Sequence, residues 1–181
     1  MIFTPLSIEG AYKIELDRKE DERGWFARAW CRDEFEMHGL EGEMLQSSFS
    51  YNKSAGTLRG MHLQRRPSFE GKLVRCIAGR VHDVIVDLRA NSASFCRHTA
   101  VQLDATNGVA LYIPPGVAHG FQSLVDESTV LYMMTDRYTP ELADGVRWND
   151  EAFGIAWPMP VTCIAERDAS YPDFDSRRAW S

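Results

Sequence analysis

The sequence predicts an all-β fold, a sandwich or a barrel of short strands. Apolar runs rich in Val, Ile and Tyr recur along the chain between turn residues; examples are KLVRCIAG, VHDVIVDL, HTAVQL, ALYIP and TVLYMM. Several of them alternate with a period of two, which is typical of strands. Strands alternating with long helices would have indicated a parallel sheet, and the sequence lacks that pattern. Short strands separated by turn signals favour a sandwich or barrel.

The elements can be placed along the chain from these runs. Residues 32–40 (RDEFEMHGL) predict a short helix that ends at Gly39, and GTLRGMHLQ (56–64) reads as the beginning of a buried strand. The apolar runs predict further strands at 72–79, 81–88, 98–103, 110–114 and 129–134. After Pro140 we expect loops with at most one helical turn. Since no linker and no repeat interrupts the chain, we expect one domain over residues 1–181.

Composition excludes several classes of partner. The chain has 181 residues, is 44% hydrophobic and 25% charged, and carries a net charge of -6 with a pI near 5.4. This balance disfavours binding to nucleic acid or to an anionic membrane surface. The four cysteines form no CxxC pair, and neither a signal peptide nor an apolar run of about 18 residues is present. These features predict a cytoplasmic protein with reduced thiols.

Two histidines lie in spaced motifs. GVALYIPPGVAHGF (108–121) follows the pattern G-x5-P-x-G-x2-H and resembles the second motif of the cupins, with His119 delivered into the barrel. The first cupin motif, G-x5-H-x-H, is only half present: His62 is followed by Leu63 and Gln64. Glu70 follows at a looser distance than the motif requires. Because a metal site needs three or four N or O ligands, we expect no metal.

Without a metal, His62 is either a proton-transfer base or a core histidine with satisfied hydrogen bonds. Cations crowd the surrounding stretch, namely Arg59, Arg65, Arg66, Lys72 and Arg75. Arg65 and Arg66 fit a solvated loop, whereas Arg59 and Lys72 border apolar runs and indicate an anionic partner. Arg59 and His62 would face opposite sides of a regular strand. They can serve one site only if Gly60 marks a bulge or if they act at different ends of the site.

Longer segments resemble the dTDP-4-dehydrorhamnose 3,5-epimerases and related nucleotide-sugar epimerases of the cupin superfamily. The matching segments are DERGWF (21–26), GTLRGMHLQ (56–64), GKLVRCIAGRVHDVIVDLR (71–89), IPPGVAHGFQSL (113–124), LYMMTDRYTPE (131–141), GVRWNDEAFGIAWP (145–158) and ERD (166–168). The resemblance implies a cupin or jelly-roll barrel with short peripheral helices. It also implies a homodimer that exchanges N-terminal strands.

The resemblance implies a reaction and a role for each matching residue. The substrate is a nucleotide-linked 4-keto-6-deoxyhexose, whose ketone acidifies the protons on C3 and C5. His62 is the base, Asp168 orients it, Lys72 stabilises the enolate oxygen and Tyr132 is the acid on the opposite face. No cofactor is expected. The resemblance assigns substrate binding to Arg23 (in the neighbouring subunit's site), Phe26, Gln46, Arg59, His119 and Tyr138.

Two positions depart from the family pattern and leave alternatives open. Arg28 stands where relatives carry a glutamate that helps to hold the thymine, and Ser48 stands where they carry an asparagine. A CDP or other nucleotide sugar is therefore an alternative to the dTDP sugar. Epimerisation at C3 or C5 alone, and 3,4-ketoisomerisation, are alternative reactions. Two competing classes are a non-enzymatic nucleotide-sugar-binding cupin and a metal-dependent cupin enzyme, which the incomplete first motif disfavours.

Overall fold

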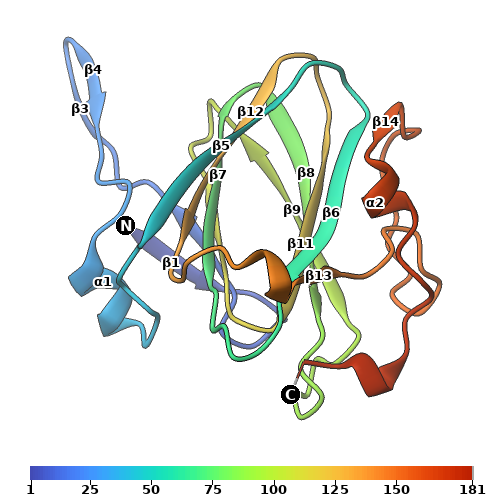
Figure 1. Ribbon diagram of the computed structural model, residues 1–181. Helices are drawn as coiled ribbons and strands as arrows, with labels where there is room; N and C mark the ends of the chain where they lie inside the picture. The colour runs from blue at the N-terminus through green and yellow to red at the C-terminus, as the bar shows by residue number, and fades with distance from the viewer. Residues whose placement is uncertain (181) are drawn as a thin grey trace.

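The computed structural model describes residues 1–180, which form two β-sheets that face each other across an apolar interior (Figure 1). The first sheet has the order β1 (Ile2–Pro5), β2 (Tyr12–Glu15), β10 (Ala110–Ile113), β7 (Lys72–Ala78), β12 (Ser128–Met134), β5 (Gln46–Asn52). The second has the order β13 (Ala143–Gly145), β6 (Thr57–Gln64), β11 (Val117–Ser123), β8 (Arg80–Asp87), β9 (His98–Asp104). The pairs within both orders are antiparallel, and β14 (Cys163–Ile164) adds to β6 in parallel.

Three further features lie outside the two sheets. The hairpin of β3 (Lys19–Asp21) and β4 (Gly24–Phe26) projects away from the barrel (Figure 1). Helix α1 (Arg32–Met37) packs Phe35 onto the first sheet beside Leu73 and Tyr112. The segment after β12 contains η1 (Pro140–Leu142), α2 (Glu166–Ala169) and η2 (Ser176–Arg178). It passes along the outer side of the second sheet.

The core follows the two-residue alternation of the strands. Val74, Val130, Ile85 and Phe121 point inward from the two sheets and are buried in one cluster. On the outer side of the second sheet, Met61 and its neighbours are covered by the later segment of the chain, including Phe153 and Trp180. Strands β6 and β8 therefore have buried residues on both faces.

The pairing of β6 with β11 contains a bulge. His119 lies opposite His62 and Phe121 lies opposite Arg59, so two steps on β11 match three steps on β6. Because directly opposed residues share a face, and His119 and Phe121 are two positions apart, Arg59 and His62 face the same side of the sheet. The bulge at Gly60 that the sequence required for a shared site is present.

Two glycines make this bulge possible. Gly60 has a φ of +133°, and a Cβ atom added to it would lie 2.5 Å from the Cα of Gly120. A Cβ atom on Gly120 would lie 2.8 Å from the carbonyl oxygen of Arg59. Since these atoms belong to backbone, neither contact can be relieved by a side-chain rotation. The two strands can approach this closely only with glycine at both positions.

The all-β prediction is confirmed, and the expected strands between residues 72 and 134 agree with β7, β8, β9, β10 and β12. The short helix is found at Arg32–Met37, and Gly39 follows it with a φ of +71°. Strands β1 to β5, β11, β13 and β14 were not predicted. The expectation of loops with at most one helical turn after Pro140 was wrong, because the described part of that segment contains η1, α2 and η2 as well as β13 and β14. No helix within residues 1–180 is long and apolar enough to cross a lipid bilayer.

We predict that Gly60→Ala lowers the free energy of unfolding far more than Gly24→Ala. Gly24 has a comparable φ of +124° with no atom within 4 Å of the added Cβ. Gly24→Ala therefore introduces backbone strain alone, about 1–3 kcal/mol. Gly60→Ala adds the clash with Gly120 and should cost at least about 2 kcal/mol more. Denaturant titration of both variants measures the difference, and equal losses would contradict the close approach of β6 and β11.

Candidate active site

The centre of the candidate site is a hydrogen bond between His62 on β6 and Asp168 on α2. The Nε2 atom of His62 lies 2.7 Å from Oδ1 of Asp168. An ionised carboxylate only accepts hydrogen bonds, so Nε2 carries the proton and the lone pair of the neutral ring is on Nδ1. The His62 side chain is 42% exposed, whereas that of Asp168 is 7% exposed. The imidazole can therefore accept a proton from a ligand while the carboxylate behind it is shielded.

The bulge also orients Asp168. Its second oxygen, Oδ2, accepts a hydrogen bond of 3.1 Å from the backbone N–H of Gly60. Burial alone would raise the pKa of Asp168, but its hydrogen bond to His62, the charge of His62 and the Gly60 N–H outweigh burial. The pKa of Asp168 is consequently below its usual value. An ionised Asp168 favours the protonated form of His62 once a proton has been transferred.

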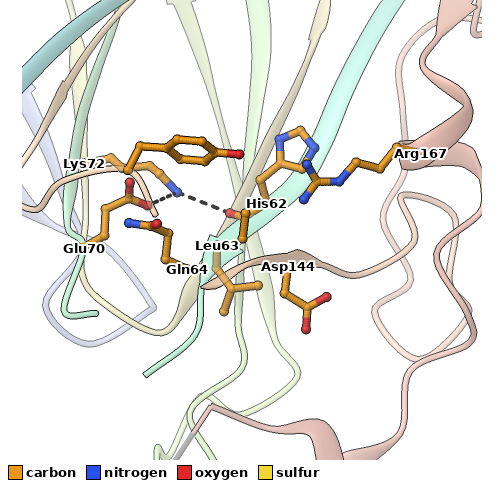
Figure 2. Close-up of a pocket in the computed structure, with 9 residues that line it drawn as sticks. His62, Leu63, Gln64, Glu70, Lys72, Asp144 and Arg167 are labelled. Atoms are coloured by element: carbon orange, nitrogen blue, oxygen red, sulfur yellow. Dashed lines mark hydrogen bonds and ion pairs between the residues drawn. The ribbon is translucent and has the colours of Figure 1, made fainter. Parts of the chain in front are cut away.

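Lys72 lies at the beginning of β7, across the barrel mouth from His62 (Figure 2). Its Nζ atom forms an ion pair of 2.9 Å with Glu70 and lies 3.4 Å from the carbonyl oxygen of His62. Both side chains of the ion pair are largely buried. A cation held in this way can stabilise negative charge that develops on a bound oxygen.

A second buried pair lies deeper in the barrel. Nε2 of His119 is 2.9 Å from Oδ2 and 3.0 Å from Oδ1 of Asp83, and both residues are buried. The ring of Tyr132 lies edge-on to His119, with 5.7 Å between the ring centroids. Burial raises the pKa of Tyr132, and the negative charge of Asp83 raises it further. The phenol is therefore protonated at neutral pH and can act as a proton donor.

Arg59 lies on the same face of β6 as His62. Its Nε atom donates to Oδ1 of Asn52 at 2.8 Å, and Nη2 donates to the carbonyl oxygen of Tyr51 at 3.3 Å. These contacts hold the guanidinium of an exposed residue in one orientation. A guanidinium in a fixed orientation suits bidentate contacts with phosphate oxygens.

A cavity of about 270 Å³ opens at the barrel mouth between β6, β7 and α2. Its lining residues are His62, Leu63, Gln64, Glu70, Lys72, Tyr138, Ala143, Asp144 and Arg167. Of the residues expected at the site, His62, Lys72 and Tyr138 line this cavity directly. Asp168 does not line the cavity but is hydrogen-bonded to His62, and His119 lies opposite His62 on the neighbouring strand.

The N-terminal candidates lie elsewhere. Arg23 and Phe26 are on the β3–β4 hairpin, with 84% of the Arg23 side chain and 77% of Phe26 exposed (Figure 1). Arg23 forms an ion pair with Asp21 of the same hairpin. Within one chain, the structure does not bring these two residues to the cavity of His62. Arg28, which replaces the expected glutamate, forms a 2.7 Å ion pair with Glu34.

Several residues of the site were missed by the sequence analysis. Glu70 was considered only as a metal ligand, and it is the partner of Lys72. Asp83 and Arg167 were not singled out, although Asp83 falls on the inward face of the alternating run VHDVIVDL. Arg167 interacts with the hydroxyls of Tyr171 and Tyr138 and lines the cavity. Within residues 1–180, no group of three or more His, Cys, Asp or Glu side chains could hold a metal ion.

We predict a pH-dependent stability difference between the wild type and Asp168→Asn. A carboxylate whose pKa is lowered by folding stabilises the fold above its unfolded pKa of about 3.9, and this stabilisation disappears as the pH falls through the folded pKa. The variant should be the less stable protein from pH 7 to pH 5. The difference should shrink below about pH 4. Denaturant unfolding across this range tests the prediction, and a difference that stays constant down to pH 3 would contradict it.

Comparison with known proteins identifies the family of this chain. Residues 5–176 match the family model described as dTDP-4-dehydrorhamnose 3,5-epimerase. The Salmonella typhimurium enzyme of that name is 40% identical over 177 residues, which cover 97% of this chain and 96% of that protein. The crystal structure of the Elizabethkingia anophelis enzyme superimposes with a TM-score of 0.93 at 37% identity, covering 96% of both chains.

A further structure holds a nucleotide sugar. The 3'-monoepimerase ChmJ of Streptomyces bikiniensis, in complex with dTDP-quinovose, superimposes with a TM-score of 0.86 at 32% identity. The match covers 93% of this chain and 86% of ChmJ. The chain therefore belongs to the dTDP-4-dehydrorhamnose 3,5-epimerase family and has the cupin jelly-roll fold of that family.

Proposed function

We propose that the protein converts dTDP-4-dehydro-6-deoxyglucose to dTDP-4-dehydrorhamnose by epimerising C3 and C5. The observation that carries this proposal is the His62–Asp168 pair: Asp168 binds Nε2 of His62, which leaves Nδ1 for a ligand, and His62 lines the same cavity as Lys72. Family membership supplies the substrate class, because the relatives compared above are epimerases of 4-keto sugars linked to dTDP or are named for that reaction.

The first half of the reaction is removal of a proton beside the ketone. The C4 carbonyl acidifies the protons on C3 and C5, and Nδ1 of His62 takes one of them. Asp168 stabilises the imidazolium that results. Electron density moves onto the C4 oxygen, where the ammonium of Lys72 stabilises the enolate. Glu70 holds Lys72 in place by its ion pair.

The second half returns a proton to the opposite face of the sugar. Tyr132 is the donor in this proposal. The ring of His119, which is hydrogen-bonded to Asp83, packs edge-on against the ring of Tyr132. Its raised pKa keeps the phenol protonated through the neutral range. After the transfer, solvent reprotonates the tyrosinate and accepts the proton from His62. The same two steps can then take place at the second carbon.

Arg59 and His119 supply donors for the diphosphate, and Gln46 and Tyr138 contact the nucleotide or sugar. The ChmJ complex supports a dTDP sugar as the ligand class. Because ChmJ is described as a 3'-monoepimerase, epimerisation at C3 alone is the second candidate function for this chain. Both functions use the same proton-transfer residues and differ in whether the bound sugar presents its second carbon to them.

We further propose that the protein is a homodimer in which Arg23 and Phe26 reach the partner's cavity. The hairpin that carries them projects away from its own barrel (Figure 1). The outer face of the first sheet also exposes Phe49, Tyr51 and Ile77, and an exposed apolar patch of this kind is typical of an interface. The four free cysteines are compatible with a reducing, cytoplasmic location.

Deuterium incorporation tests the proposed reaction. The wild type, incubated in D₂O with dTDP-4-dehydro-6-deoxyglucose, should incorporate deuterium at C3 and C5, with and without a chelator, as followed by NMR. Incorporation at C3 alone would identify the second candidate function. Absence of incorporation would reject a dTDP sugar as substrate, and loss of incorporation with the chelator would contradict a metal-free mechanism.

Two variants separate the base from the acid in this assay. His62→Ala should reduce incorporation by at least about 1,000-fold, because general base catalysis is lost together with the Asp168 pair. His82→Ala is the matched control, since His82 packs on Trp157 at the outer face of the second sheet. Tyr132→Phe should still release the substrate proton but accumulate little epimerised product. Full turnover by Tyr132→Phe would mean that another group is the acid.

Complementation tests the shared site. Arg23→Ala and His62→Ala should each be impaired alone, whereas co-expressed chains with different tags should regain activity. In a random mixture of the two chains about half of the dimers are heterodimers, and each heterodimer has one intact site and one doubly impaired site. About a quarter of all sites are therefore intact. The heterodimers can be purified through both tags. If they are no more active than the two parent variants, Arg23 does not contribute to the partner's site.

A further inference from the structure

Gln64 makes an unusual set of contacts at the end of β6. Its amide is buried, and its Oε1 atom accepts from the backbone N–H of Thr139 at 2.7 Å. Its Nε2 atom donates to the carbonyl oxygen of Arg137 at 3.0 Å and to Oγ of Ser68 at 3.2 Å. The side chain therefore binds the backbone on both sides of Tyr138.

A second glutamine holds the same segment from the other sheet. Gln46, at the beginning of β5, accepts through Oε1 from the backbone N–H of Tyr138. Three successive residues, 137 to 139, thus have a backbone group bound by a glutamine side chain. Because Gln46 belongs to the first sheet and Gln64 to the second, the two amides fix this segment between the sheets at the barrel mouth.

Tyr138 depends on this anchoring because its ring is not held by burial. The residue is 54% exposed, yet it lines the cavity together with His62 and Lys72. Its side chain has one further interaction across the cavity, with Arg167 of α2. The two glutamines fix the backbone from which the ring projects, and the contact with Arg167 restrains the ring itself, so the position of Tyr138 beside the cavity depends on the anchored backbone.

We propose that Gln64 is a positioning residue that holds Tyr138 against the bound sugar nucleotide. The inference rests on the proposed function, in which Tyr138 contacts the substrate. Gln64 occupies the position at which the first cupin motif has its second histidine. Here the side chain at that position binds the backbone of a substrate-contacting loop.

Gln122 provides a matched control for Gln64. It is a buried glutamine of the same sheet, on β11, and its amide also binds backbone on both of its atoms. Its Nε2 atom donates to the carbonyl oxygen of Met159 at 2.9 Å, and its Oε1 atom accepts from the Met159 N–H at 3.1 Å. Met159 does not line the cavity. Gln64→Met and Gln122→Met remove comparable hydrogen bonds, but only the first affects the loop of Tyr138.

A double-mutant cycle with Tyr138→Ala tests the inference by kinetics. Both glutamine variants should lower the Tm, since each leaves buried backbone groups without a partner. Gln64→Met should lower kcat/KM about tenfold, mainly through KM, whereas Gln122→Met should change it less than about twofold. In the Tyr138→Ala background, Gln64→Met should have no further effect. An equal loss in both backgrounds would overturn the inference.

A spectroscopic arm separates this inference from the proposed function. In protein labelled with 3-fluorotyrosine, the ¹⁹F resonance of Tyr138 is assigned by its loss in Tyr138→Phe. Gln64→Met should move this resonance toward the free amino acid, and Gln122→Met should leave it unchanged. An unmoved resonance overturns the positioning role whatever the activity, whereas a shifted resonance with an inactive wild type rejects only the proposed reaction. If Gln64→Met does not fold, Gln64→Glu, which keeps an acceptor for Thr139, takes its place.

Discussion

The close approach of β6 and β11 at Gly60 and Gly120 is the constraint on which the site depends. The extra residue in β6 turns Arg59 and His62 to the same face, which a regular strand cannot do. It also leaves the Gly60 N–H outside the strand ladder, where it binds Asp168. One local irregularity thus aligns the base, its carboxylate and a phosphate-binding candidate.

The structure places two acidic groups, Asp168 and Tyr132, in environments that favour opposite protonation states. Asp168 is ionised because a histidine and a backbone N–H compensate for its burial. Tyr132 is neutral because burial and the charge of Asp83 both disfavour the phenolate. The difference arises from the hydrogen-bond donors around each group, since both are shielded from solvent. Two groups with different surroundings can therefore hold opposite protonation states at the same pH.

The sequence predicted the strands that show a two-residue period, but it did not predict contacts between residues that lie far apart along the chain. The alternating runs placed β7 to β10 and β12 correctly because each buries one or both faces within a few residues. Strands β1 and β2 are short and mostly unburied, so no apolar run marks them, whereas β10 is equally short but fully buried. Asp168 lies 106 residues from His62 and was identified only by family resemblance. From the sequence, a bulge at Gly60 was one condition under which Arg59 and His62 could serve one site. Only the pairing register of β6 and β11 shows that the bulge is present.

Besides His62, three positions correspond to cupin metal ligands in this barrel, and all three are engaged in other contacts. Glu70 is paired with Lys72, His119 is bound by Asp83, and Gln64 binds the backbone of residues 137 and 139. Replacing Gln64 with histidine would therefore not restore a ligand set, because Glu70 and His119 would still have to leave buried charged partners. The same replacement would release the loop that carries Tyr138. In this chain each of these positions is held by contacts that a metal would have to break.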